Sequence, residues 1–167
     1  KHLDGLATRL KTMDGTVAWI ARDLVARIRD LTVAANELER RIVEAVAGLA
    51  PALLELAGVG ALTAAKIVGE VADVRRFRSK DAFARHNGTA PLPVWSGNTI
   101  RHRLSRTGNR QLNAAIHRIA VTQMRIHQPA KDYLERRIGM RNTKTEALRA
   151  LKRRLSDVVF RALLADA

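Results

Sequence analysis

Residues 51–68 read PALLELAGVGALTAAKIV, and this stretch decides how the middle of the chain folds. Three leucines in its first half predict a short apolar helix. The turn residues Gly58-Val59-Gly60 separate that helix from a second one that is rich in small residues. An apolar helix, a Gly-x-Gly turn and a small-residue helix together are typical of the helix-hairpin-helix. We therefore expect this motif over residues 51–73.

Gly58, Gly60 and Lys66 are the candidate DNA-binding residues of this motif. The glycines permit the turn and leave backbone N–H groups bare at the start of the second helix. Such groups bind a phosphate oxygen without reading the bases. Lys66 lies one turn further along and adds positive charge. Because the same hairpin also occurs as a plain packing unit, DNA contact and packing both remain open at this point.

Residues 1–50 carry an apolar repeat of seven residues. One set of positions comprises Val17, Leu24, Leu31, Leu38 and Ala45, and a second set, four residues later, comprises Ala21, Ile28, Ala35, Ile42 and Leu49. Leu3 and Leu10 extend the first set, although Asp14-Gly15-Thr16 either interrupts the helix or caps a fresh one. A narrow seam of this kind predicts a coiled coil that dimerises the protein or spaces two domains. The alternative is a long helix that packs on its own domain.

The composition favours an all-α fold, with a long helix over residues 1–50 followed by a helical domain over residues 51–167. Hydrophobic residues make up 47% of the 167 residues but aromatic residues only 4%, so the core must be aliphatic. The lack of cysteine excludes disulfides and thiolate metal sites. Because no apolar run approaches the roughly 18 residues of a membrane span, we expect no membrane partner.

The positive charge is concentrated in one block. The formal net charge is +14, and residues 75–154 hold 20 Lys and Arg against 4 Asp and Glu. A basic block of this kind attracts phosphate polyanions and releases their counterions on binding. Anionic lipid is a weaker candidate, since the block lacks the Trp- and Phe-rich apolar face of an interfacial helix. Nucleic acid is therefore the expected partner, and a scaffold with incidental charge is the alternative.

Residues 87–108 are rich in Gly, Pro, Ser, Thr and Asn, and we expect a long irregular loop here before helices resume over residues 109–167. A loop of this length inside a compact domain is usually functional or mobile. The loop and the residues just after it carry four candidate DNA-binding arginines. These are Arg101, Arg103, Arg106 and Arg110.

Two serines of this loop are candidate nucleophiles, Ser96 before Gly97 and Ser105 before Arg106. Neighbouring arginines could neutralise the charge that develops on an attacked phosphodiester. From the residues alone, a loop serine is more commonly structural. The few acidic residues and the scattered histidines of the basic block show no metal-ligand spacing, so we expect no metal site and no cofactor in this chain.

An ordered series of motifs resembles the C-terminal transposase domain of the DEDD-type insertion-sequence transposases, which include the pilin-gene invertase and the bridge-RNA-guided recombinases. The resemblance covers about residues 50–127 and starts with residues 53–68. It continues through segments similar to the family's conserved stretches: Phe77–Phe83, Asn87–Pro91, Ser96-Gly97 and Arg103–Leu112. The heptad helix resembles the coiled-coil linker of the same family.

The resemblance implies a two-part recombinase of the bacterial cytoplasm and nucleoid. An N-terminal RuvC-like domain would supply four acidic ligands for Mg²⁺, and the C-terminal domain would supply a serine that attaches covalently to DNA. Carried over by position, that serine is Ser96, with Ser105 in reserve. Since part of the family uses a guide RNA, the resemblance extends the expected partners to RNA. The heptad helix implies a homo-oligomer.

Two features depart from the family pattern. No strand pattern with acidic residues represents a RuvC-like domain, so we expect that domain before residue 1 and no recombination by this chain alone. Asn113 stands where the family usually has arginine. The alternative function is a non-catalytic helix-hairpin-helix module that binds nucleic acid.

Overall fold

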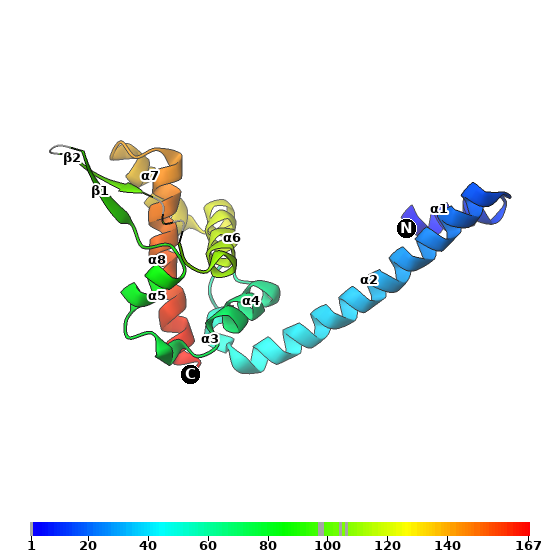
Figure 1. Ribbon diagram of the computed structural model, residues 1–167, viewed down its shortest axis with the longest axis horizontal. Coiled ribbons are helices and arrows are strands. Elements are labelled where there is room, and N and C mark those ends of the chain that lie inside the picture. The colour runs from blue at the N-terminus through cyan, green and yellow to red at the C-terminus, as the bar shows by residue number, and fades with distance from the viewer. Residues whose placement is uncertain (1, 97–98, 104, 106) are drawn as a thin grey trace. The chain divides into compact units, whose positions relative to one another are not determined.

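The computed structural model describes the backbone of residues 2–96, 99–103, 105 and 107–167 (Figure 1). The chain divides into two compact units, Lys1–Ile42 and Val43–Ala167, and each is described by itself. The expected all-α fold with a long N-terminal helix is confirmed, since helices dominate the described residues of both units.

The first unit is a helical hairpin. Helix α1 spans His2–Lys11 and helix α2 spans Thr16–Leu49, which continues into the second unit. Between them Gly15 has φ +102°, a left-handed conformation that favours glycine. Arg22 donates hydrogen bonds to the carbonyl oxygens of Leu10 and Met13, both at 3.3 Å. These bonds fold α1 back along α2.

Of the two alternatives that the sequence left open at Asp14-Gly15-Thr16, the start of a fresh helix is the one that the structure shows. Thr16 begins a fresh helix, and Leu3 and Leu10 belong to α1 instead of extending the seam of α2. Leu10 is buried against this hairpin together with Ala18 and Val25, which lie outside the heptad seam. The leucines of the seam on α2 are exposed.

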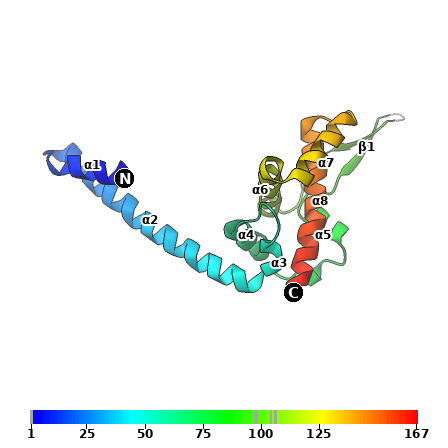
Figure 2. The ribbon, with the colours of Figure 1, turned by 180° about the vertical axis from the view of Figure 1, so that it is seen from behind.

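The second unit is built around its last helix. Its elements in chain order are α3 (Pro51–Leu54), α4 (Ala61–Val71), η1 (Val74–Arg76), α5 (Lys80–His86), β1 (Leu92–Ser96), β2 (Thr99–Arg103), α6 (Arg110–Ile126), α7 (Gln128–Gly139) and α8 (Lys144–Ala165). Helix α8 contacts α3, α5, α6 and α7 (Figure 2). A capping box of Thr143 and Glu146 satisfies the first N–H groups of α8 and fixes where it begins.

The core of this unit is aliphatic, as the composition predicts. Leu53, Ile67, Leu112, Ile116 and Ile119 are fully buried between α3, α4, α6 and α8. The three phenylalanines add aromatic contacts, with the ring centre of Phe83 5.3 Å from that of Phe77 and 5.5 Å from that of Phe160. Full burial of each such side chain contributes roughly 1.5–3 kcal/mol.

Residues 87–108 are not the irregular loop that their composition predicts. Strands β1 and β2 pair in an antiparallel hairpin whose register runs from Leu92 opposite Arg103 to Ser96 opposite Thr99. The β-formers Val94 and Trp95 on one arm and Thr99 and Ile100 on the other favour an extended backbone, which suits a pleated ribbon. Pro91 and Pro93 are tolerated because a two-stranded ribbon has only edge strands.

Candidate nucleic-acid interface

Two glycines bring the ends of the β1–β2 hairpin together. Gly88 has φ +69° and Gly108 has φ +107°. A Cβ atom on Gly108 would lie 2.7 Å from the carbonyl oxygen of His86 and 2.9 Å from the nitrogen of Gly88. The next residue, Asn109, donates its backbone N–H to that same His86 oxygen at 2.7 Å. The base of the hairpin is thereby fixed at the end of α5.

A buried polar network ties this base to the surrounding helices. Asn87 is fully buried, and its Nδ2 donates to Oγ of Ser156 on α8 at 2.8 Å. Its Oδ1 accepts from the backbone nitrogen and the hydroxyl of Thr89, at 3.0 and 2.6 Å. Asn113 of α6 donates to the Asn87 carbonyl oxygen at 2.7 Å. Because every buried polar group here has a partner, the network stabilises one position of the base.

The network ends in a buried lysine. Lys152 of α8 is 8% exposed, and its Nζ donates to Oδ1 of Asn113 at 2.7 Å. Burial, with a smaller contribution from the charge of Arg110, lowers the pKa of Lys152. Asn113, the residue that departs from the family pattern, therefore bridges Asn87 and Lys152. An arginine at this position would bring a second cation toward Lys152.

The two candidate nucleophiles occupy opposite ends of the hairpin. Ser96 is the last residue of β1, at the end of the ribbon away from its base. Ser105 lies at the base, is 6% exposed, and its Oγ donates to the Thr107 carbonyl oxygen at 3.1 Å. The structure thus separates the two serines and encloses the reserve candidate.

The structure gives the backbone position of three of the four candidate arginines near the hairpin. Arg101 and Arg103 are on β2, opposite Val94 and Leu92 in the register. Their side chains and the whole of Arg106 lie outside the described residues. Arg110 is the first residue of α6 and is exposed. Their grouping around Ser96 therefore stays a prediction.

The turn between α3 and α4 packs against α6. Gly58 has φ +82°, and a Cβ there would lie 3.3 Å from the Ile119 carbonyl oxygen. Gln123 of α6 donates to the Ala57 carbonyl oxygen at 2.7 Å. These contacts explain Gly58 by packing. Gly60 is exposed at the start of α4, where no side chain caps the helix, so a phosphate contact there stays a prediction.

Lys66 is less available to DNA than its sequence position suggests. Its Nζ lies 3.6 Å from Oε1 of Glu70, one turn further along α4. Oε2 of Glu70 in turn accepts a hydrogen bond from Nδ2 of Asn109 at 2.6 Å. The carboxylate therefore links the lysine to the hairpin base.

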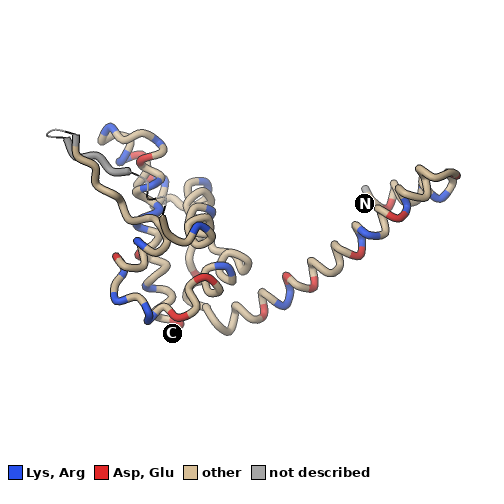
Figure 3. The backbone as a smooth tube through the Cα atoms, viewed as in Figure 1, with Lys and Arg blue, Asp and Glu red and all other residues tan. Residues whose placement is uncertain are grey.

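The second unit carries more basic than acidic residues. Figure 3 shows Lys and Arg along α5, α6, α7 and α8 with few acidic residues, whereas the first unit carries both signs. Arginines and a lysine of α7 and α8 line a cavity of about 730 Å³ beside the hairpin base. This cavity was not predicted from the sequence. A signal was present, however: Lys152 and Arg153 follow Arg149 by three and four residues, a spacing that puts all three on one face of a helix.

Metal-binding clusters and membrane-spanning helices are both absent from the described residues. No group of three or more His, Cys, Asp or Glu side chains in that part of the chain could hold a metal ion. No helix in it combines the length and the apolar character of a membrane span.

Comparison with known proteins identifies the family of the segment that contains this hairpin. Residues 50–135 match the model of the transposase IS116/IS110/IS902 family. The chain belongs to this family of transposases. The matched segment contains α3 to α6, the hairpin with both serines, and three members of the buried network, Asn87, Thr89 and Asn113. The family resemblance of the sequence is thereby confirmed at the level of the transposase domain.

Two curated relatives come from the same group of insertion elements. The chain is 34% identical over 119 residues, 71% of its length, to the insertion element IS110 uncharacterized 43.6 kDa protein of Streptomyces coelicolor. It is 33% identical over 110 residues, 65% of its length, to the insertion element IS116 uncharacterized 44.8 kDa protein of Streptomyces clavuligerus. The aligned regions cover 29% and 27% of these relatives, so the chain spans under a third of their length.

Proposed function

We propose that residues 43–167 are the DNA-binding domain of an insertion-sequence transposase and that Ser96 is its nucleophile. The observation that supports this is the overlap of the family match, residues 50–135, with a block that holds 20 basic and 4 acidic residues. Backbone phosphates are the natural partner of such a surface in a transposase. The hairpin then holds Ser96 at the end of a ribbon whose base is fixed.

The proposed reaction is a transesterification at a DNA phosphodiester. Oγ of Ser96 forms a bond to phosphorus, one bond from phosphorus to a deoxyribose oxygen breaks, and that oxygen takes up the proton that the serine gives up. Arg101, Arg103, Arg106 and Arg110 are proposed to stabilise the extra negative charge of the transition state. Reversal of this step with a different deoxyribose hydroxyl joins the strand to a new partner.

Mg²⁺, which the family resemblance implies, does not fit the residues at hand. The described part of the chain offers no cluster of carboxylates that could bind it. We therefore propose that acidic residues outside this chain bind the metal, and the roles given above to Ser96 and the arginines do not depend on it. A guide RNA is a further proposal that rests on the resemblance alone.

The chain is expected to bind DNA with a strong dependence on salt. If the basic unit neutralises about four phosphates, the slope of log affinity against log salt is about −3.6, and affinity falls roughly 100-fold between 50 and 200 mM salt. Fluorescence anisotropy of a labelled duplex over this range measures the slope. A slope near zero would contradict DNA binding and favour the scaffold alternative.

We also propose that the heptad face of α2 makes the protein a homo-oligomer. Leu24, Leu31 and Leu38 are 53%, 69% and 56% exposed, which is unusual for a row of leucines on one face. Such a row is stable in water when a second copy covers it. The interface residues are those of the two heptad sets defined above.

Leu31→Glu is expected to convert the oligomer into monomers, because it places a charge in the seam. Val33→Glu is the matched control, since Val33 is also 69% exposed but lies on the opposite side of the heptad. Sedimentation equilibrium distinguishes the two. Equal effects of both variants, or a monomeric unmodified chain, would refute the coiled coil.

A further inference from the structure

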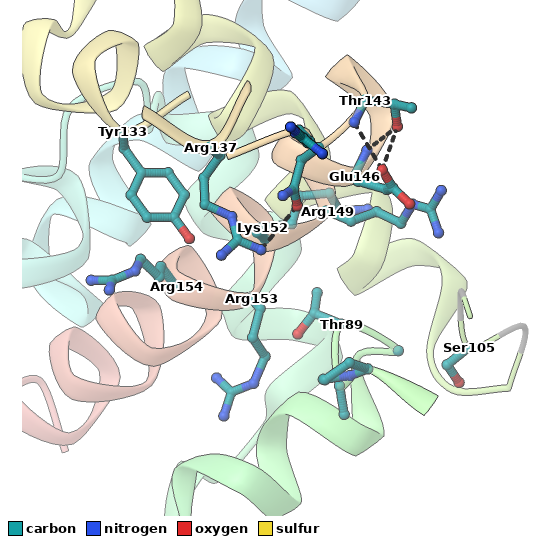
Figure 4. A pocket seen from close by; sticks show the side chains of 16 residues that line it. Thr89, Ser105, Tyr133, Arg137, Thr143, Glu146, Arg149, Lys152, Arg153 and Arg154 are labelled. Carbon is teal, nitrogen blue, oxygen red and sulfur yellow. Dashed lines mark hydrogen bonds between the residues drawn. The ribbon is translucent and has the colours of Figure 1, made fainter. Parts of the chain in front are cut away.

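The cavity beside the hairpin is formed by elements that are far apart in the sequence. One wall consists of Gly88, Thr89, Ala90 and Pro91 with Ser105, and the other comes from α7, α8 and the turn between them. Figure 4 shows Tyr133 and Arg137 of α7 and Lys152 and Arg153 of α8 around this space, with Thr89 across from them. The cavity thus adjoins the fixed base of the ribbon that carries Ser96.

Positive charge dominates the lining. Six basic side chains contribute to it, namely Arg137, Arg141, Arg149, Lys152, Arg153 and Arg154, against the single carboxylate of Glu146. Glu146 accepts hydrogen bonds from the backbone nitrogen and the hydroxyl of Thr143. Arg153 forms ion pairs with Asp81 and Asp157.

Two of the cations are held in place by the fold. Lys152 is 8% exposed and is anchored to Asn113. Arg137 is half-buried, and its Nη2 donates to Oδ1 of Asn142 at 3.1 Å. Its Nε is buried and has no hydrogen-bond partner among the described residues. A buried N–H group without a partner is costly, so an acceptor supplied by a ligand would stabilise it.

Tyr133 adds a flat wall to the cavity. The guanidinium of Arg154 lies 4.9 Å from the centre of its ring. This stacking holds Arg154 at the edge of the cavity instead of leaving it free in solvent. An aromatic ring flanked by arginines suits a nucleotide, which offers both an anion and a flat or apolar surface.

We propose that this cavity binds backbone phosphates of the DNA strand, as a second site distinct from the hairpin arginines. The proposal rests on the proposed function, because it takes the DNA partner from there. A cavity of about 730 Å³ is far larger than one phosphate group needs, and six cations exceed the charge of one phosphate. Consecutive phosphates of one strand satisfy both the volume and the charge. Phosphates bound here would position the strand relative to the hairpin without reading its sequence.

The test compares two double variants of the chain with equal loss of charge. Arg149→Gln with Arg154→Gln removes two cations from the cavity. Arg118→Gln with Arg125→Gln removes two exposed cations of α6 that do not line it. Anisotropy with a labelled duplex gives the salt slope of each. The cavity variant is expected to lower the magnitude of the slope by about 2, since each lost phosphate contact removes about 0.9. The α6 variant is expected to change the slope by less, because neither of its residues lines the cavity.

Three outcomes would overturn the proposal. These are an unchanged slope in the cavity variant, an equal change in both double variants, or a change seen with labelled RNA but not with DNA. Failure of the unmodified chain to bind DNA would instead refute the proposed function. Arg149→Lys with Arg154→Lys keeps both charges and is expected to restore the slope. Thermal melts of all variants show that a lost contact, and not a lost fold, causes the change.

Discussion

Replacement of Ser96 by alanine is expected to abolish the covalent protein–DNA adduct completely while DNA binding persists. The adduct is a bond between Oγ of residue 96 and phosphorus, and alanine has no atom that can form it. Removal of a catalytic serine typically lowers turnover by about 10⁶-fold, so no residual adduct should be detectable. Binding persists because basic side chains and backbone groups supply the phosphate contacts.

The assay uses the intact protein that contains these residues, with Mg²⁺, any partner RNA and labelled target DNA, and denaturing gels to reveal the adduct. Ser105→Ala is the matched control. Ser105 is 6% exposed and bonded to Thr107, so its loss is expected to cost about 1 kcal/mol of stability and to leave the adduct intact. An adduct lost only in Ser105→Ala would move the nucleophile to the hairpin base. If the unmodified protein binds DNA but forms no adduct, the serine nucleophile is contradicted and a non-catalytic module that binds nucleic acid is favoured.

Gly108→Ala is expected to destabilise the second unit by about 3 kcal/mol, the largest stability effect of any single glycine in the described chain. The backbone at Gly108 has φ +107°, which a residue with a Cβ rarely adopts. The added Cβ would also meet three backbone atoms, at 2.7, 2.9 and 3.1 Å, and backbone cannot move aside as a flexible side chain can. Relief of the clash requires the base of the hairpin to separate from α5.

Gly69→Ala is the control for this prediction. Gly69 lies inside α4, is exposed, and has no atom within 4 Å of an added Cβ. Alanine there is expected to stabilise the unit by about 1 kcal/mol, because alanine favours a helix more than glycine does. Urea denaturation followed by circular dichroism measures both free energies of unfolding. Similar values for the two variants would show that the approach of Gly88 and Gly108 is not what fixes the hairpin.

The helical parts of the fold could be predicted because their signals are local. The helix of residues 51–54, the turn at Gly58-Val59-Gly60 and the aliphatic stripe of α6 follow from apolar spacing and turn residues. The hairpin was missed although its signal is present. Val94 and Trp95 on one arm and Thr99 and Ile100 on the other flank Gly97-Asn98, a pair typical of two-residue hairpin turns. The many Pro, Ser and Thr residues around these positions favour an irregular loop when the segment is judged by its composition alone.

The contacts that define the site could not be predicted in the same way. Asn87 and Ser156 are 69 residues apart and meet only because α5 packs against α8. Each looks like an ordinary polar residue in the sequence, and nothing local marks it as buried. The basic cavity depends on the same packing, because it joins α7 and α8 to residues that precede the hairpin.

The carboxylate of Asp166 closes the second unit on itself. Its two oxygens accept hydrogen bonds from the backbone nitrogens of Ala52 and Leu53, at 2.8 and 3.1 Å, and so cap α3 from the far end of the sequence. The two ends of the fold therefore lie side by side. Neighbouring ends are what allow a domain to be inserted into a host loop or circularly permuted without stretching its backbone. In the second unit, two hydrogen bonds thus hold residues 52 and 53 beside residue 166, so that one carboxylate links segments 114 and 113 positions apart.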